Sequence, residues 1–261
     1  MDLKSFPILY DEESREQVEK FIYEHFECED DSDEEGMICH EIKSEYVHTD
    51  VYNFNSGFID GNRIYVTCGM GARSQNSLRP GYDHIELMMF GSENLKNDIY
   101  VMNQLVNLSK YPFRNSSWVG PFHTIDVMEE IKEKFGYAYL WFLPEFAEVE
   151  AKNCFEECTH TVKFLPLIPI YEDERNVLAR MDESSEELRS KLLEALQEDN
   201  SMFFVDVPRQ SLATGLDYSK IDIKDREAFA NDLKDMLQEF IDIGDIDYED
   251  DEDDEDDIND D

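Results

Sequence analysis

The sequence is poor in cationic residues. It has 23 Lys and Arg against 63 Asp and Glu, which gives a formal net charge of -40. This deficit of positive charge excludes direct binding to nucleic acid, which needs a basic patch with stacking aromatic residues, and it disfavours anionic membranes. Two explanations of the acidity stay open: solubility alone, and attraction to a basic protein partner.

Long apolar runs and a regular cysteine pattern are also lacking. No stretch approaches the roughly 18 apolar residues that a membrane span needs, and residues 1–14 lack the features of a signal peptide. The five cysteines are odd in number and show no framework spacing, which is typical of reduced thiols. We therefore expect a cytoplasmic protein without a membrane segment.

Catalytic motifs are missing from the chain. Gly69-Met70-Gly71 has no third glycine at the dinucleotide-binding spacing and indicates a turn that ends a strand, and no P-loop occurs. No Gly-x-Ser-x-Gly or His-Glu-x-x-His is present either. We expect a non-enzymatic protein without a cofactor. A metal-dependent hydrolase of unrecognised type is the alternative.

One short motif resembles half of a zinc site. Cys154, Cys158 and His160 follow a Cys-x3-Cys-x-His spacing. The other half has to come from Cys28, Cys39 or His40, near the other end of the chain. Free cysteines and no bound metal are the prediction.

A second candidate pair is His48-x-Asp50. In a strand, both side chains point to one face of the sheet. We predict a hydrogen-bonded structural pair there, with a metal or acid–base pair as the alternative. The acidic loop at 29–35 lacks the full calcium-loop pattern.

Hydrophobic periodicity predicts a mixture of strands and helices. The predicted strands cover residues 46–54, 63–70, 84–90, 137–143, 160–170 and 202–207. The predicted helices cover 14–26, 97–109, 171–180, a segment from Ser184 through Leu196, and 224–241. This pattern predicts an α+β fold: a single domain with a central mixed, largely antiparallel sheet flanked by helices.

Several residues predict where these elements begin and end. Asp60-Gly61 predicts a hairpin between the first two strands, and Ser14 or Asp11 caps the first helix. Tyr111-Pro112 is predicted to end the second helix. Ser184-x-x-Glu187 predicts a capping box. Because proline cannot donate to a sheet ladder, Pro166 and Pro169 predict an edge strand or a bend.

The C-terminal end differs in composition from the rest. Residues 245–261 contain no Lys or Arg, and Asp and Glu dominate. Such a segment buries too little apolar surface to offset the entropy of ordering, so we predict a disordered acidic tail. Residues 242–261 hold 14 acidic residues, so the remainder keeps a charge of -26. We expect the domain to fold without the tail.

Short pieces spread along the chain resemble the suppressor of fused family, in the compact form found in bacteria. The match spans about residues 40–212, and six or seven pieces occur in the family's order. They are His48-Thr49-Asp50-Val51-Tyr52, Val66-Thr67-Cys68-Gly69-Met70, Ile85-Glu86-Leu87-Met88-Met89, Pro121-Phe122-His123-Thr124-Ile125, Val162-Lys163-Phe164-Leu165, Pro169-Ile170-Tyr171-x-x-Glu174 and Phe204-Val205-Asp206-Val207-Pro208-Arg209.

The resemblance implies a domain organisation. Residues 1–212 are expected to form the suppressor-of-fused-like domain, residues 213–244 an amphipathic helix packed on it, and residues 245–261 the tail. Larger animal members bind a transcription factor in a cleft between this domain and a second one. We do not expect that cleft here, because one helix and an acidic tail follow residue 212.

The resemblance also implies a function. Bacterial members resemble immunity proteins, which neutralise a toxin by binding it, so we expect a protein that occludes its partner, possibly a basic toxin domain. A cytosolic adaptor with a non-toxin partner is the alternative. The candidate binding residues are His123, Tyr171, Glu174, Asp206 and Arg209. Structural roles are the competing interpretation: an Asp206–Arg209 ion pair, and Glu174 at the start of a helix.

Overall fold

The computed structural model describes residues 9–26, 37–40, 46–56, 62–95, 98–154, 158–199, 202 and 204–217. These residues belong to one unit of the chain, Met1–Tyr218. The predicted helix at 224–241, the acidic tail, the acidic loop at 29–35 and the turn at Asp60-Gly61 lie outside the described residues.

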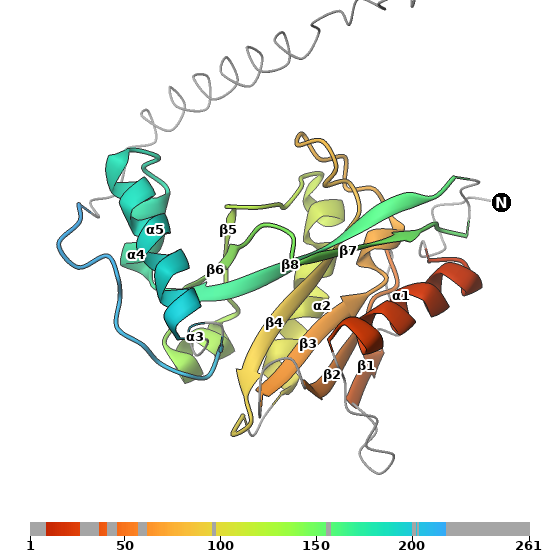
Figure 1. Ribbon diagram of the computed structural model, residues 1–261, viewed down its shortest axis with the longest axis horizontal. Helices are drawn as coiled ribbons and strands as arrows, with labels where there is room; N and C mark the ends of the chain where they lie inside the picture. Colours follow the sequence, from red (N-terminus) through yellow and green to blue (C-terminus); the bar gives the residue numbers. More distant parts are fainter. Residues whose placement is uncertain are drawn as a thin grey trace, which may run out of the picture. The chain divides into compact units, whose positions relative to one another are not determined.

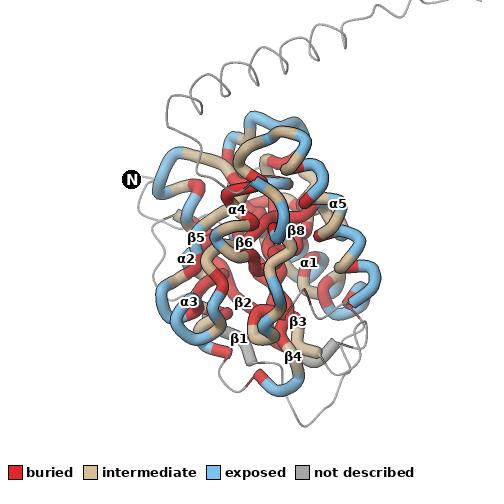
Figure 2. The backbone as a smooth tube through the Cα atoms, turned by 90° about the vertical axis from the view of Figure 1, so that its left-hand side faces the viewer, coloured by how far each residue is buried: buried red, intermediate tan, exposed pale blue. Residues whose placement is uncertain are grey.

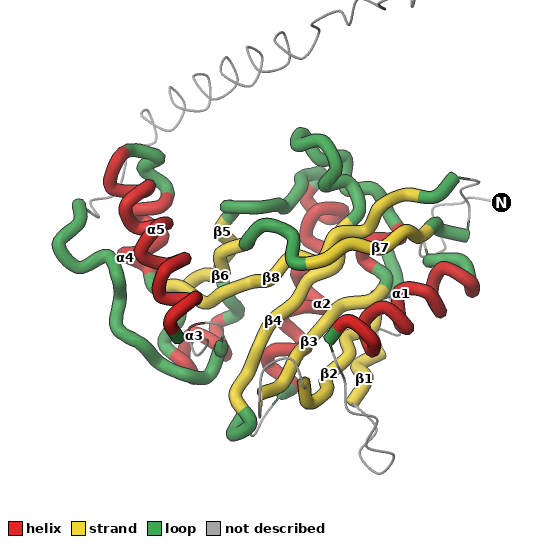
Figure 3. Tube along the Cα trace, in the orientation of Figure 1, coloured by secondary structure: helices red, strands yellow, loops and turns green. Residues whose placement is uncertain are grey.

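Groups of consecutive strands are separated by helices along the chain (Figure 3). The helices are α1 (Glu12–His25), α2 (Ile99–Asn115), α3 (Glu129–Phe135), α4 (Glu172–Leu178) and α5 (Glu183–Glu198), with a 3-10 turn at Met70–Ala72. The strands are β1 (Met37–His40), β2 (Asp50–Ser56), β3 (Asn62–Cys68), β4 (Ile85–Ser92), β5 (Thr124–Asp126), β6 (Tyr139–Phe142), β7 (Ala147–Ala151) and β8 (His160–Ile170).

The strands form one mixed sheet in the order β1-β2-β3-β4-β8-β6-β5, and β7 also pairs with β8 (Figure 1). The pairing of β4 with β8 is parallel, with Leu87 opposite Leu165. The other strand pairings in the described residues are antiparallel. β2 and β3 pair as the predicted hairpin. The expected α+β fold with a largely antiparallel sheet is thus confirmed.

Alternate residues of the strands pack on opposite faces of the sheet, where different helices cover them. On one face, Val18, Ile22 and Phe26 contact an apolar cluster that includes Ile64 and Phe164. On the other face, α2 packs against a cluster that includes Tyr65, Leu87 and Leu165. The sheet is therefore the buried centre of the domain, with exposed helical surface around it (Figure 2).

A third apolar cluster lies where β6 and the last residues of β8 meet α4 and α5. Trp141 and Ile168 from the strands pack with Val177 of α4 and Leu188 and Leu192 of α5. These leucines recur at the spacing of one helical face, as the sequence predicts. None of the helices in the described residues combines the length and the apolar character that a membrane span requires.

The predicted edge position of residues 160–170 is wrong. β8 lies inside the sheet, between β4 on one side and β6 with β7 on the other. Pro166 is tolerated because it faces the gap between β6 and β7, where its carbonyl still accepts the amide of Leu143 at 2.9 Å. The backbone of Pro169 points to the opposite edge of β8, the edge that pairs with β4. It lies beyond Pro166, the last residue of β8 that pairs with β4. Neither position needs the amide that proline lacks.

Three predicted element limits also need correction. α2 continues through Pro112 to Asn115, because proline in the last turn removes only one intrahelical bond, and Ser116 then ends the helix in a left-handed conformation. Asp182 caps α5 by accepting the amide of Ser185, so Ser184 lies inside the helix. Residues 202–207 do not form a strand; Phe204 makes a single bridge to Phe90.

Candidate functional site

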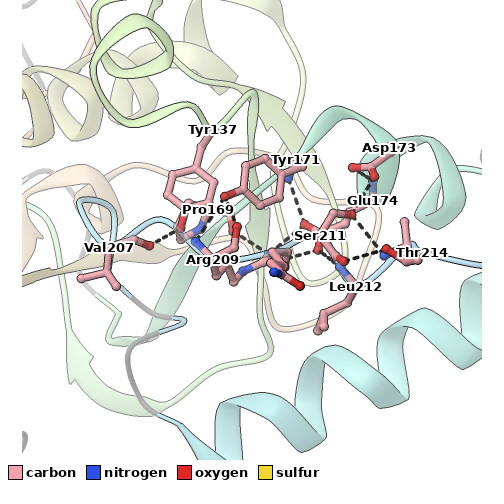
Figure 4. A network of polar contacts seen from close by, with 12 residues as sticks. Tyr137, Pro169, Tyr171, Asp173, Glu174, Val207, Arg209, Ser211, Leu212 and Thr214 are labelled. Atoms are coloured by element: carbon pink, nitrogen blue, oxygen red, sulfur yellow. Dashed lines mark hydrogen bonds and ion pairs between the residues drawn. The ribbon is translucent and has the colours of Figure 1, made fainter.

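Three of the five predicted site residues come together at the junction of β8 and α4. Tyr171 follows the last residue of β8, and Glu174 lies in the first turn of α4. Arg209 lies in residues 204–217, which we call the C-terminal segment, and its side chain reaches Glu174 (Figure 4). Asp206 and His123 lie elsewhere. The structure thus joins two of the sequence pieces that carry the family resemblance.

Glu174 caps the helix in which it lies. Its carboxylate accepts the amide of Tyr171 at 2.9 Å, which satisfies one of the amides left open at a helix N-terminus. The negative charge also lies near the positive end of the helix dipole. The predicted structural role of Glu174 at the start of a helix is confirmed.

The same carboxylate binds Arg209 in a two-point ion pair. Nη1 donates to Oε1 and Nη2 donates to Oε2 at 2.7 Å. Nη2 also donates to the carbonyl of Pro169 at 3.2 Å, the acceptor beyond the end of the β4 pairing. The amide of Leu212 adds a further donor to Oε1 at 2.8 Å. Glu174 is fully buried, so its charge is balanced inside the protein.

Two tyrosines extend this network to the backbone of the C-terminal segment. The hydroxyl of Tyr171 donates to the carbonyl of Arg209, and the Arg209 amide donates back to that hydroxyl at 3.2 Å. The hydroxyl of Tyr137 donates to the carbonyl of Val207. We call these five residues, Tyr137, Tyr171, Glu174, Arg209 and Leu212, the Glu174 network. It holds the segment 207–214 against β8 and α4.

The Glu174 network is suited to holding structure. Both carboxylate oxygens of Glu174 accept hydrogen bonds from protein donors. A general base needs a lone pair within reach of a substrate proton, and Glu174 is enclosed. Any effect of Glu174 on binding therefore acts through the segment that it holds.

The predicted ion pair between Asp206 and Arg209 is wrong. Asp206 accepts the amide of Ser92 at 2.8 Å and the hydroxyl of Ser92 at 2.6 Å. These bonds fasten the C-terminal segment to the end of β4, next to the bridge between Phe90 and Phe204. Arg209 turns the other way, toward Glu174.

His123 lies apart from the Glu174 network, just before β5. Its ring packs against Trp118 at 4.3 Å between centroids, and burial lowers its pKa. The preceding residue, Phe122, has φ +70 and an exposed ring. This is a rare conformation for a bulky side chain.

A buried carboxyl that the sequence analysis did not single out is Glu86, the second residue of β4. It accepts hydrogen bonds from the hydroxyls of Tyr10 (2.7 Å) and Thr67 (2.6 Å) and from the amides of Gly69 (2.8 Å) and Gly71 (3.0 Å). Burial raises its pKa to about 7, against the opposing effect of these donors. The signal in the sequence was an acidic residue inside the apolar run Ile85 to Phe90.

Gly69 and Gly71 form the predicted turn at the end of β3, and the turn brings their amides to Glu86. Gly69 has φ +124, and a Cβ there would lie 2.0 Å from the carbonyl oxygen of His48. The position therefore requires glycine.

The second predicted pair, His48 and Asp50, is confirmed as structural. Nε2 of His48 lies 3.2 Å from Asp50, whose other oxygen accepts from Arg15 of α1 at 2.5 Å. Cys154 and Cys158 are exposed free thiols, and His160 stacks on His84. Within the described residues, no three His, Cys, Asp or Glu side chains form a group able to hold a metal ion.

Comparisons with known proteins agree with this architecture. The family model described as suppressor of fused protein matches residues 45–210. Curated protein sequences give no match. Among solved structures, the Sufu–Fu complex shares 12% identity and has a TM-score of 0.53, with 77% of this chain and 92% of that chain covered. This likeness shows a shared fold.

Two further solved structures are similar. A suppressor of fused homologue from Neisseria gonorrhoeae FA 1090 shares 16% identity and has a TM-score of 0.49, covering 76% of this chain and 96% of that one. Drosophila Suppressor of Fused shares 15% identity with a TM-score of 0.46, covering 74% and 46%. Because the family model covers more than half of the 261 residues, the chain belongs to the suppressor of fused family, a family of regulatory, protein-binding domains.

Proposed function

We propose that this protein is a non-enzymatic binding domain of the immunity or regulatory type, which neutralises a basic protein partner in the cytoplasm by occluding it. Membership of the suppressor of fused family carries the proposal. A solved relative is a Sufu–Fu complex, so another protein of this fold associates with a protein partner.

The charge supports a basic partner. Outside the last 20 residues the chain still carries -26. Exposed glutamates follow the outer surfaces of two helices: Glu12, Glu13, Glu16 and Glu24 on α1, and Glu183, Glu186, Glu187, Glu194 and Glu198 on α5. Such a field speeds association with a cationic protein by roughly 10–1000-fold at low salt. Affinity itself depends on a few anchoring side chains.

The predicted binding residues divide into two groups under this proposal. Glu174 and Arg209 are buried or nearly so, and with Tyr171 and Asp206 they act by positioning the segment 207–214. His123 is half-buried and follows the exposed Phe122, so it lies where a partner can reach it. Among these five predicted residues, direct contact with the partner is therefore proposed only for His123.

Affinity capture from the native host, followed by cross-linking, tests the proposal. We expect a basic protein that cross-links to the folded part of the chain. If a large secreted protein with a variable C-terminal domain is encoded next to this chain, the partner is a toxin; otherwise the regulatory adaptor function applies. Capture of acidic partners alone contradicts the proposal.

Kinetics with the captured partner test the role of charge. Association rates should fall steeply between low and physiological salt, while dissociation rates change little. A variant with Glu186 and Glu194 changed to Gln should associate more slowly and remain folded, because both side chains are exposed. Association rates that are insensitive to salt rule out electrostatic steering.

A further inference from the structure

A cleft of about 420 Å³ opens beside the first residues of β8 and the residues that precede β4. Asp83, His84, Glu148, His160, Thr161 and Lys163 line it. This volume lies within the range of small ligand-binding pockets, which is about 300–1,000 Å³. The cleft is separate from the Glu174 network, none of whose members line it.

The side-chain donors of Lys163 and Thr161, which line this cleft, are already engaged. The ammonium group of Lys163 donates to Glu145 at 2.8 Å and lies 3.8 Å from Glu148. The hydroxyl of Thr161 donates to Glu150 at 2.7 Å.

The acceptors of the cleft, in contrast, remain available. Nδ1 of His84 lies 2.8 Å from the carbonyl of Gly71. Because a carbonyl only accepts, Nδ1 donates in this contact, and in the neutral ring Nε2 is then the acceptor. Asp83 accepts from the hydroxyl of Ser74 and from the amide of Ser77, both through Oδ1. Among the described residues, Oδ2 of Asp83 and Oε1 of Glu148 accept no hydrogen bond.

Hydrogen bonds and ring stacking fix the position of His84. Gly71, which accepts from its ring, donates its amide to the buried Glu86. The ring also stacks on that of His160, with 3.6 Å between centroids and 20° between planes. Both stacked imidazoles belong to residues that line the cleft.

The charge of the cleft favours a cation. Three carboxylates, those of Asp83, Glu145 and Glu148, lie in or beside the cleft, against the ammonium group of Lys163. A ligand that fits must be positively charged and must donate hydrogen bonds. A guanidinium group has five donors and no acceptor, pairs with carboxylates and stacks on aromatic rings, whereas an ammonium group does not stack in this way.

We propose that this cleft receives an arginine side chain of the partner protein, whose guanidinium donates to Asp83, Glu148 and Nε2 of His84. The inference rests on the proposed function, since it names one anchor of a basic partner. It also explains how a chain with this much acidic surface selects one arginine. The acceptors of Asp83, His84 and Glu148 line the same cleft, whereas the exposed glutamates of α1 and α5 are spread along helical surfaces.

NMR titration of the whole protein with Nα-acetyl-arginine amide tests the inference. We expect saturable shifts confined to residues near 81–84 and 160–163, with a dissociation constant in the millimolar range. The ¹⁵N signal of Nε2 of His84 should shift as that atom accepts a hydrogen bond. The corresponding citrulline amide, which is neutral but similar in shape, should bind at least about tenfold more weakly, because hydrogen bonds to a charged group are the stronger ones.

Matched variants separate the cleft from the overall charge. Asp83→Asn with Glu148→Gln should weaken arginine binding about tenfold or more, whereas Glu130→Gln with Glu133→Gln removes the same charge from exposed positions of α3 and should leave binding unchanged. If Asp83→Asn disturbs the loop before β4, Glu148→Gln alone gives the test, because that side chain is 59% exposed. Equal binding of arginine and citrulline amides, or shifts outside the cleft, overturns the inference.

The captured partner distinguishes this inference from the proposed function. Partner binding that is lost with Asp83→Asn and Glu148→Gln, but not with the α3 variant, supports both. Partner binding that is equal in all three proteins refutes the cleft while the proposed function stands. If the arginine amide binds the cleft and no basic partner is captured, the proposed function fails while the cleft remains an arginine site.

Discussion

Arg209 and Glu174, 35 residues apart in the chain, form a two-point ion pair in which the carboxylate is fully buried and the guanidinium side chain is 10% exposed. The pair joins the segment after residue 204 to the first turn of α4. A buried ion pair is stable only while both charges are present. If one partner is removed, the other charge stays buried with neither a counter-charge nor water to compensate it.

Removal of Arg209 is therefore expected to be strongly destabilising. Arg209→Met leaves the Glu174 charge buried without its partner and should lower the free energy of unfolding by about 3–5 kcal/mol. The double variant Arg209→Met with Glu174→Gln should recover part of this loss. Urea denaturation measures both. Lys191→Gln, which breaks an exposed pair with Glu187, is the control and should change stability by less than about 1 kcal/mol.

Loss of the Tyr171 hydroxyl should loosen the same segment locally. Tyr171→Phe removes the bonds to the backbone of Arg209, so we expect a loss of about 1 kcal/mol. Amide hydrogen exchange should speed up in residues 207–214 before other regions. Tyr139→Phe is the control, because the hydroxyl of Tyr139 makes no hydrogen bond within the described residues. Unchanged exchange at 207–214 contradicts the role assigned to Tyr171.

Glu86 should make stability depend on pH near neutrality. Burial raises its pKa from 4.5 to about 7, so the native state holds the proton more tightly than the unfolded state. The stabilisation is complete below pH 4.5 and is lost as the pH rises through 7. At about 1.36 kcal/mol per pKa unit, the whole loss is roughly 3 kcal/mol.

A comparison with Glu86→Gln isolates this effect. The free energy of unfolding of the unchanged protein, relative to the variant, should fall between about pH 5 and pH 8. His123 acts in the opposite sense, because burial lowers its pKa, but it is present in both proteins and cancels. Parallel pH profiles would show that Glu86 does not titrate in this range.

The turn after β3 should not tolerate a side chain at Gly69. In Gly69→Ala the new Cβ meets the carbonyl of His48 and the backbone keeps φ +124, so we expect a loss of roughly 3 kcal/mol or more. Gly136→Ala is the matched control. It has φ +81 but nothing within 4 Å of a Cβ, and should lose about 1–2 kcal/mol. Thermal unfolding compares the two; equal losses would mean that the close contact relaxes.

Local patterns were enough to place most of the long elements. α1 and α5 have apolar residues at the helical spacing, and β3 and β4 are apolar runs of strand length. Two short elements, α3 and β7, were not predicted. α3 buries only Ile131, and β7 has five residues with two glutamates among them. Elements of this size carry too little periodicity to be recognised alone.

For the candidate site, the family resemblance selected Tyr171, Glu174 and Arg209 but not their relationship. Arg209 was assigned to Asp206 because the two are close in sequence; in the folded chain it lies against Glu174 instead. The bonds of Glu86 and the cleft beside β8 were not predicted, since both depend on residues from distant parts of the chain. Glu86 is bonded to Tyr10 near the N-terminus, and the cleft is lined by residues before β4 and from β7 and β8.

By itself the sequence determined the charge, the missing catalytic motifs, the α+β class and the presence of each long helix and strand, because these properties depend on composition and on neighbours along the chain. Only the tertiary structure decided that β8 lies inside the sheet despite two prolines, and that Glu174 pairs with Arg209. The physical reason is the same in both cases. Whether a proline or a charge is tolerated depends on what faces it across space, and distant segments supply those groups.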